Sequence, residues 1–104
     1  MHSWELTVTK DSKAVVSKAG QLQDDKFAAL VTKDIALPLA KVNMSVGESL
    51  DYGSLRVSAS VTLMCDQNEA AINRAAELGF TKALELMQDG FSLYGMKAGP
   101  TNAG

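Results

Sequence analysis

The chain has 104 residues, of which 46% are hydrophobic and 21% charged, and its formal net charge is −2. This size and composition predict one globular domain with a small core and argue against a disordered protein. The slight negative charge argues against a general binder of polyanions. We expect the domain to cover residues 1–94, followed by a flexible tail at 95–104 that has no apolar face to bury.

No segment predicts secretion or insertion into a membrane. The first ten residues lack the apolar stretch of a signal peptide, and no apolar run approaches the ~20 residues that cross a bilayer. The single cysteine, Cys65, cannot form an intramolecular disulfide and is expected to be a small buried hydrophobic residue. We therefore expect a cytoplasmic protein with no membrane partner.

Alternating apolar and polar residues predict three strands, near 4–9, 41–46 and 54–65. The third strand has the most regular pattern, because every second residue from Leu55 to Cys65 is apolar. Residues 10–20 contain few apolar side chains and predict a loop or a poorly specified helix, and a short helix near 21–33 follows. The stretch 47–53, bracketed by glycines, predicts a long loop that joins the second and third strands as an antiparallel hairpin.

Residues 67–89 have the pattern of a long helix, and two signals mark its ends. Asp66 and Glu69 have the spacing of a capping box, and Gly90 suits the left-handed position that follows a helix. The predicted fold class is therefore α+β, a small antiparallel sheet that the long helix covers on one face.

Two rows of apolar side chains run along this helix, each with a spacing of four residues. The bulky row contains Ile72, Ala76, Phe80 and Leu84, and the small row contains Ala71, Ala75, Gly79 and Ala83. Gly79 costs about 1 kcal/mol relative to Ala inside a helix, so the close approach of another backbone is expected to offset it. Two interpretations stay open, in which the small row packs on the chain's own sheet or contacts the same helix of a second copy. Leu78, nearly opposite the expected core face, adds to the second interpretation.

The predicted core is thin for a chain of this length. A three-stranded sheet with one helix buries little apolar area against the conformational entropy that folding removes. Self-association through a sheet edge or through the small row would add buried area. We therefore expect a homodimer or a larger homo-oligomer.

Candidate catalytic and metal-binding groups are few. His2 is the only histidine and is expected to be exposed near the terminus, so no Ser-His-Asp or Cys-His arrangement can be assembled. One histidine and one cysteine do not make a metal site, and no glycine-rich phosphate loop precedes a helix. We expect a protein that is not an enzyme and that holds neither metal nor cofactor.

The candidate binding residues are Lys41, Tyr52 and Arg56. Lys41 and Arg56 are expected to form a small basic patch near the hairpin, and Tyr52 in its loop could stack on a nucleic-acid base. The open face of the third strand has no aromatic residue, unlike the sheet of an RNA-recognition domain. Trp4 is expected to anchor the core or an interface. Nucleic acid and a protein are therefore both candidate partners.

The glycine-bracketed turn with Asp51 and Tyr52, the alternating strand and the acidic-capped helix follow one another across residues 42–90. In this order the chain resembles small uncharacterised proteins encoded in phages and prophages. The resemblance implies a small viral accessory protein and transfers no functional residue. The leading hypothesis is a non-enzymatic, self-associating accessory protein that acts by binding, with single-stranded nucleic acid as a candidate ligand. The alternatives are a protein-binding inhibitor or adaptor and a structural component of a viral particle.

Overall fold

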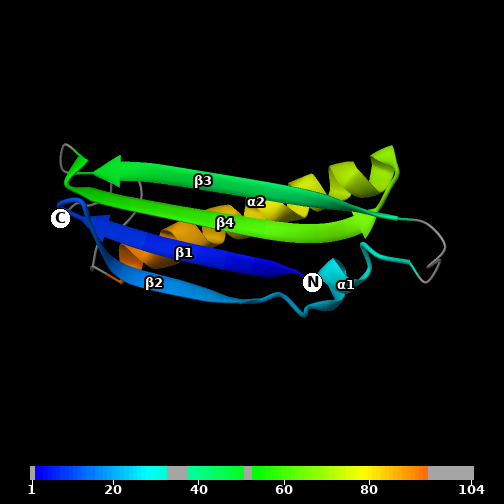
Figure 1. Ribbon diagram of the computed structural model, residues 1–104, viewed down its shortest axis with the longest axis horizontal. Coiled ribbons are helices and arrows are strands. Elements are labelled where there is room, and N and C mark those ends of the chain that lie inside the picture. Colours follow the sequence, from blue (N-terminus) through cyan, green and yellow to red (C-terminus); the bar gives the residue numbers. More distant parts are fainter. Residues whose placement is uncertain (1, 33–37, 51–52, 94–104) are drawn as a thin grey trace.

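The computed structural model describes residues 2–32, 38–50 and 53–93. These residues form, in chain order, β1 (Ser3–Lys10), β2 (Lys13–Gln21), α1 (Asp25–Ala28), β3 (Leu39–Leu50), β4 (Leu55–Asp66) and α2 (Glu69–Ser92). The strands make one antiparallel sheet in the order β2-β1-β4-β3. Helix α2 crosses one face of this sheet, from β3 at its N-terminal end to β1 at its C-terminal end (Figure 1). The predicted α+β fold is confirmed.

Strand β2 corrects the prediction of a loop or helix at residues 10–20. Asp11 and Ser12 turn the chain back from β1, and both have positive φ, 51° and 69°. Two such residues make a turn of type I′, whose twist matches that of a hairpin. Strand β2 lies at the edge of the sheet and most of its residues are exposed. Burial therefore imposes no apolar alternation on its sequence.

The hairpin of β3 and β4 is longer, and its loop shorter, than predicted. Leu50 pairs with Leu55, so Gly47 and Glu48 belong to strand β3 and not to a loop. Gly47 lies next to the guanidinium of Arg56, since a Cβ at this position would lie 2.9 Å from its Nη2 atom. Tyr52, Asp51 and the expected tail lie outside the described residues.

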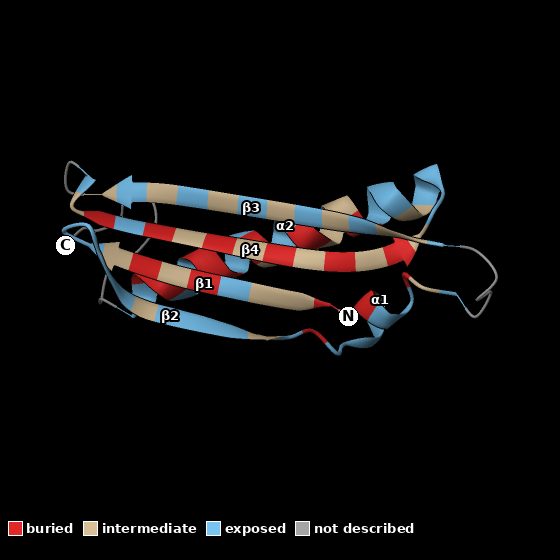
Figure 2. Ribbon diagram, in the orientation of Figure 1, coloured by how far each residue is buried: buried red, intermediate tan, exposed pale blue. Residues whose placement is uncertain are grey.

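The core lies between the sheet and α2. Every second residue of β4 from Leu55 to Cys65 is buried, as the alternation predicts (Figure 2). The prediction that Cys65 is buried is also confirmed. Phe27 of α1 is fully buried, although α1 is a single turn and much shorter than the helix expected near 21–33. One cluster of buried side chains connects all of these elements.

Both ends of α2 differ from the prediction. The N-cap is Asn68, whose side-chain oxygen accepts a hydrogen bond from the amide of Ala71 at 2.8 Å. Asp66 instead accepts from the amide of Thr32 at 3.1 Å and so holds the segment after α1. Gly90 does not end the helix, which continues to Ser92. Its role is close packing, because a Cβ at Gly90 would lie 2.6 Å from Cγ1 of Val57.

The two rows of α2 lie in different environments, one buried on the sheet and one exposed. In the small row Ala75, Gly79 and Ala83 are buried and Ala71 is half-buried, all on the chain's own sheet. Of the two interpretations, the structure supports the first, in which the small row packs on the chain's own sheet, and the assignment of these residues to a contact with a second copy is corrected. Leu78 is likewise half-buried against the core.

We predict that Gly90→Ala destabilises the protein by about 1–3 kcal/mol, although Ala favours a helix by about 1 kcal/mol. The new methyl group would lie 2.6 Å from Cγ1 of Val57 and 3.2 Å from Cδ1 of Leu6, both in the packed core. Urea unfolding followed by circular dichroism measures the change.

Gly79→Ala is the matched control for this substitution. The nearest atom to its new methyl group is Cγ of Met44 at 3.0 Å, which belongs to a flexible, half-buried side chain that can move aside. We expect Gly79→Ala to lower stability by clearly less than Gly90→Ala. A Gly90→Ala variant as stable as the wild type would contradict the close packing described above.

Candidate functional site

The structure separates the residues that were predicted to form a basic patch. Lys41 pairs with Met64, whereas Arg56 pairs with Ser49, eight residues farther along β3. At about 3.4 Å per residue the two rows lie about 27 Å apart. Both side chains are on the open face, but the guanidinium of Arg56 donates to the hydroxyl of Ser49 at 3.2 Å. Lys41 and Arg56 therefore do not make one site, and Tyr52 lies outside the described residues.

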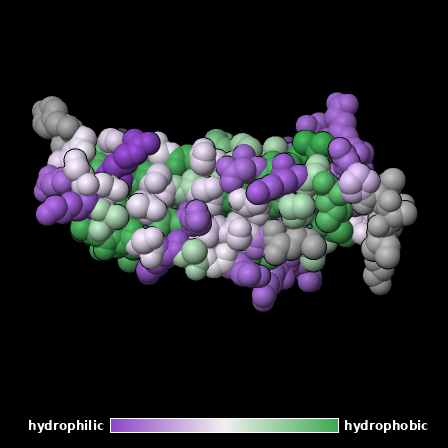
Figure 3. All heavy atoms as spheres, viewed as in Figure 1, coloured by the Kyte–Doolittle hydropathy of each residue, from purple (hydrophilic) through white to green (hydrophobic). Residues whose placement is uncertain are grey.

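The open face of the sheet carries small polar side chains. Five of them, Glu5, Thr7, Ser45, Ser58 and Ser60, surround a shallow hollow in the middle of this face. Figure 3 looks onto this face, where the white and purple of weakly and strongly hydrophilic residues predominate in the middle. A face of hydroxyl groups can form hydrogen bonds but offers no ring on which a base could stack.

The rings of the described residues lie elsewhere. Trp4 pairs with Val61, which is buried under α2, so the indole is on the covered side of the sheet. It packs over Gly20, where a Cβ would lie 2.6 Å from the indole nitrogen. The prediction of Trp4 as a core anchor is in keeping with this position, since it contacts the buried cluster.

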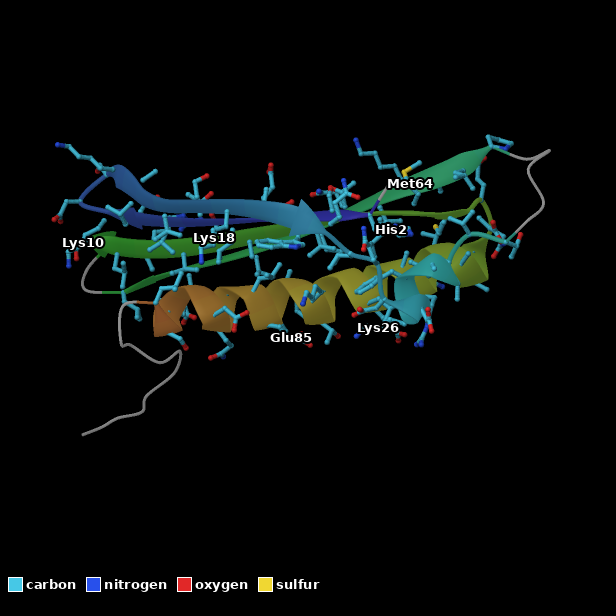
Figure 4. All side chains as sticks on the ribbon, turned by 90° about the horizontal axis from the view of Figure 1, so that it is seen from below. His2, Lys10, Lys18, Lys26, Met64 and Glu85 are labelled. Carbon is cyan, nitrogen blue, oxygen red and sulfur yellow. The ribbon has the colours of Figure 1, made fainter. Side chains whose placement is uncertain are left out.

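His2 is buried, which corrects the expectation of an exposed side chain. Its Nδ1 atom accepts a hydrogen bond from the amide of Met64 at 3.1 Å, and its carbonyl accepts one from Leu22 (Figure 4). Burial lowers the pKa of His2 below its usual value. The imidazole is therefore a neutral structural acceptor at the end of the core.

The thiol of Cys65 is buried in the core. Burial, with a smaller contribution from the charge of Asp66, raises the pKa of the Cys65 thiol. A protonated, buried thiol is a poor nucleophile. Across residues 2–32, 38–50 and 53–93 no group of three or more His, Cys, Asp or Glu side chains could hold a metal ion. In the same part of the chain no helix is long and apolar enough to cross a membrane.

Among the described residues, three of the five large exposed hydrophobic side chains lie in the bulky row of α2, which we call the α2 stripe and define as Ile72, Ala76, Phe80 and Leu84. The fractional exposures of Ile72, Phe80 and Leu84 are 37%, 45% and 37%. The neighbouring charged side chains of the helix pair with one another, Arg74 with Glu77 and Lys82 with Glu85, both at 3.7 Å. The stripe itself contains no charge.

The α2 stripe faces the β3 edge of the sheet. Gly79 packs on Met44 of β3 and Leu63 of β4, and Phe80 follows it by a turn of about 100°. Because α2 is right-handed and runs behind the sheet from β3 toward β1, that turn directs Phe80 toward β3 (Figure 1). Phe80 therefore lies on the side of α2 that is next to the edge of β3.

A scan against models of protein families found no match for this chain, and searches of curated proteins and of solved structures found none either. The resemblance to phage proteins therefore stays a prediction. The function is argued below from the geometry of the chain itself.

We predict that the protein loses stability as the pH falls below about 6.5. Burial lowers the pKa of His2 in the folded protein below the ordinary histidine value of 6.5, so the unfolded chain takes up the proton first. The contribution of neutral His2 is fully present above the unfolded pKa and is lost as the pH falls toward the folded pKa. Thermal unfolding at pH 7.5 and 5.5 measures the change in midpoint.

His2→Asn is the control for this pH dependence. The side-chain oxygen of Asn can accept the hydrogen bond from Met64 at a similar position, and it does not titrate. We expect this variant to show a smaller drop in midpoint between the two pH values. An equal drop in the midpoint of both proteins would mean that titratable groups other than His2 cause the pH dependence.

Proposed function

We propose that this protein is a non-enzymatic protein that acts by self-association and binding, and that the α2 stripe is the surface through which copies associate. The observation that carries the proposal is the exposure of Ile72, Phe80 and Leu84 in a single uncharged row. Apolar side chains that gather in a row on a surface helix are typical of an interaction site, whereas isolated ones are ordinary. Isolated exposed residues here are Val15 and Leu93.

The state of the titratable groups supports a non-enzymatic function. His2 uses its Nδ1 atom to hold the backbone, and the Cys65 thiol is buried with a raised pKa. General acid–base and nucleophilic catalysis need such groups within reach of a substrate. The hollow on the open face contains one carboxylate, that of Glu5, among hydroxyl groups.

The geometry favours a protein partner over a nucleic acid. A single-stranded nucleic acid is held by a basic groove and by rings that stack on its bases. Lys41 and Arg56 lie about 27 Å apart by strand geometry, the rings of Trp4 and Phe27 point to the core, and the exposed ring of Phe80 lies on α2 in a row without basic residues. The context that we propose is a small accessory protein of a phage, acting in the cytoplasm.

We predict that Phe80→Glu weakens self-association about thirtyfold or more. Two copies of Phe80 would lose buried apolar area and would place carboxylates in the contact, which together cost about 2 kcal/mol or more. Sedimentation of the wild type and the variant over micromolar concentrations measures the difference. Val15→Glu is the matched control, because Val15 is also an exposed apolar residue (47%) but lies on β2.

The control should associate as the wild type does. A wild-type protein that stays monomeric throughout the micromolar range would contradict the proposed function. So would a Phe80→Glu variant that associates as strongly as the wild type.

A further inference from the structure

The α2 stripe alone supplies too little energy for a stable pair of copies. Its three large side chains have roughly two fifths of their surface still exposed, 37–45%. With about 1.5–3 kcal/mol for complete burial of each, six side chains from two copies give about 4–7 kcal/mol. The loss of translational and rotational freedom on association costs about 4–15 kcal/mol. A stable pair therefore needs a second set of contacts next to the stripe.

The edge of β3 provides this second set of contacts. Among the described residues β3 pairs with β4 alone, so its other side presents unpaired backbone donors and acceptors. The strand is 12 residues long, pairs with β4 without a register shift and contains no proline. Its charged residues are Lys41, on the open face, and Glu48, which pairs with the buried Val57 and so points to the covered side. Long regular edges with few charges are the ones that accept another strand.

The opposite edge of the sheet has the features that prevent such pairing. Strand β2 contains a bulge, since Val8 pairs with Val16 but Thr9 pairs with Ala14, which leaves Val15 unpaired. Lys18 pairs with Leu6 and so points to the covered side of the sheet (Figure 4). Bulges and inward-pointing lysines both discourage edge pairing. Each edge has one charge directed to the covered side, Glu48 on β3 and Lys18 on β2, so the bulge at Val15 is the feature that distinguishes them, and β3 is the regular edge.

We infer that two copies of this chain pair antiparallel along β3, so that the two sheets join into one and the two α2 stripes meet beneath the junction. The inference rests on the proposed function and names its partner and its geometry. A twofold axis perpendicular to the sheet relates the two copies, and it passes near Met44 and Ser45, the middle of β3.

The position of Phe80 fits this axis. Its neighbour Gly79 packs against Met44, so Phe80 lies beside the middle of β3 and directed toward its edge. A twofold axis at the middle of β3 therefore brings the two Phe80 rings together under the joined sheet. About this axis Leu84 of one copy lies opposite Ala76 of the other, since both are four residues from Phe80, and Ile72 lies about one turn of helix farther out.

The charges of β3 are compatible with the same axis. With the axis at Ser45, Lys41 lies opposite Ser49 of the second copy, and Glu48 lies opposite Val42. No like charges face each other, which would destabilise a strand pair. The open face of hydroxyl groups continues across the junction.

The size of the contact also fits a specific dimer. Twelve residues of strand extend about 40 Å, and the edge together with the helix beneath it is about 15–20 Å deep. The contact then covers on the order of 600–800 Å² per copy, close to the ~800 Å² of a standard interface.

Disulfide cross-linking of Ser45→Cys tests the inference. At a twofold axis the two Cα atoms of residue 45 lie about 4.5–5.5 Å apart, within the range that a disulfide bridges. We expect Ser45→Cys to form a covalent dimer in mild oxidant within minutes. Ser49→Cys, on the same strand and face, is the matched control, because antiparallel pairing places its two copies about 27 Å apart. It should stay uncross-linked, and the buried Cys65 should not interfere.

Ser45→Lys tests the same contact without oxidation. Ser45 is exposed on the open face, so the substitution leaves the core of one copy intact but places two ammonium groups at the axis. We expect at least a tenfold weaker dimer by sedimentation, with Ser17→Lys on the exposed β2 edge as the control that changes nothing.

The outcomes separate this inference from the proposed function. If Ser45→Cys fails to cross-link and Ser45→Lys still dimerises while Phe80→Glu does not, copies associate through the stripe alone and the pairing of β3 is wrong. If Ser45→Cys and Ser49→Cys both cross-link, the strands are parallel and the twofold geometry is wrong. A wild-type monomer would overturn both proposals.

Discussion

The close approach of α2 to the sheet determines the rest of this structure. At Gly79 and Gly90 an added Cβ would lie 3.0 Å from Met44 and 2.6 Å from Val57, so the helix backbone lies against the strands. Small side chains at Ala75 and Ala83 keep this distance short along the buried row. Along Ala75, Gly79 and Ala83 the helix lies too close to the sheet for bulky side chains, and the bulky buried residues of α2, Leu86, Met87 and Phe91, lie nearer its C-terminal end. Because the small row faces the sheet, the bulky α2 stripe lies on the exposed side of the helix.

The sequence predicts β4 and α2 well because burial on one side imposes a period on each of them. Strand β2 is not predicted because an exposed edge strand needs no apolar alternation. Its one local signal in the sequence is the Asp11–Ser12 turn. Both residues have positive φ there, a conformation that Asp and Ser can adopt but that their presence in a sequence does not indicate. The helix ends are also ambiguous in sequence: Asp66 and Asn68 are both good caps, and a contact with Thr32 decides between them.

Which row of α2 faces the sheet cannot be derived from spacing, because both rows repeat every four residues. The volume between the helix and the sheet decides it, and that volume depends on the strands that the helix crosses. The predicted basic patch of Lys41 and Arg56 is wrong for a different reason. The alternation places Lys41 and Arg56 correctly on the open face, but their separation depends on where the hairpin turns. Strand β3 reaches Leu50, which sets Arg56 opposite Ser49 and far from Lys41.

The unequal edges also limit the size of the assembly. If two copies join along β3, the edges that remain at both ends of the joined sheet are those of β2, with its bulge at Val15 and its inward Lys18. Such edges do not recruit a third copy, so the pairing closes at two instead of growing into a filament. A closed dimer presents one broad face of hydroxyl groups on one side and two helices on the other. This arrangement agrees better with an accessory protein that binds as a discrete dimer than with a subunit of an extended particle.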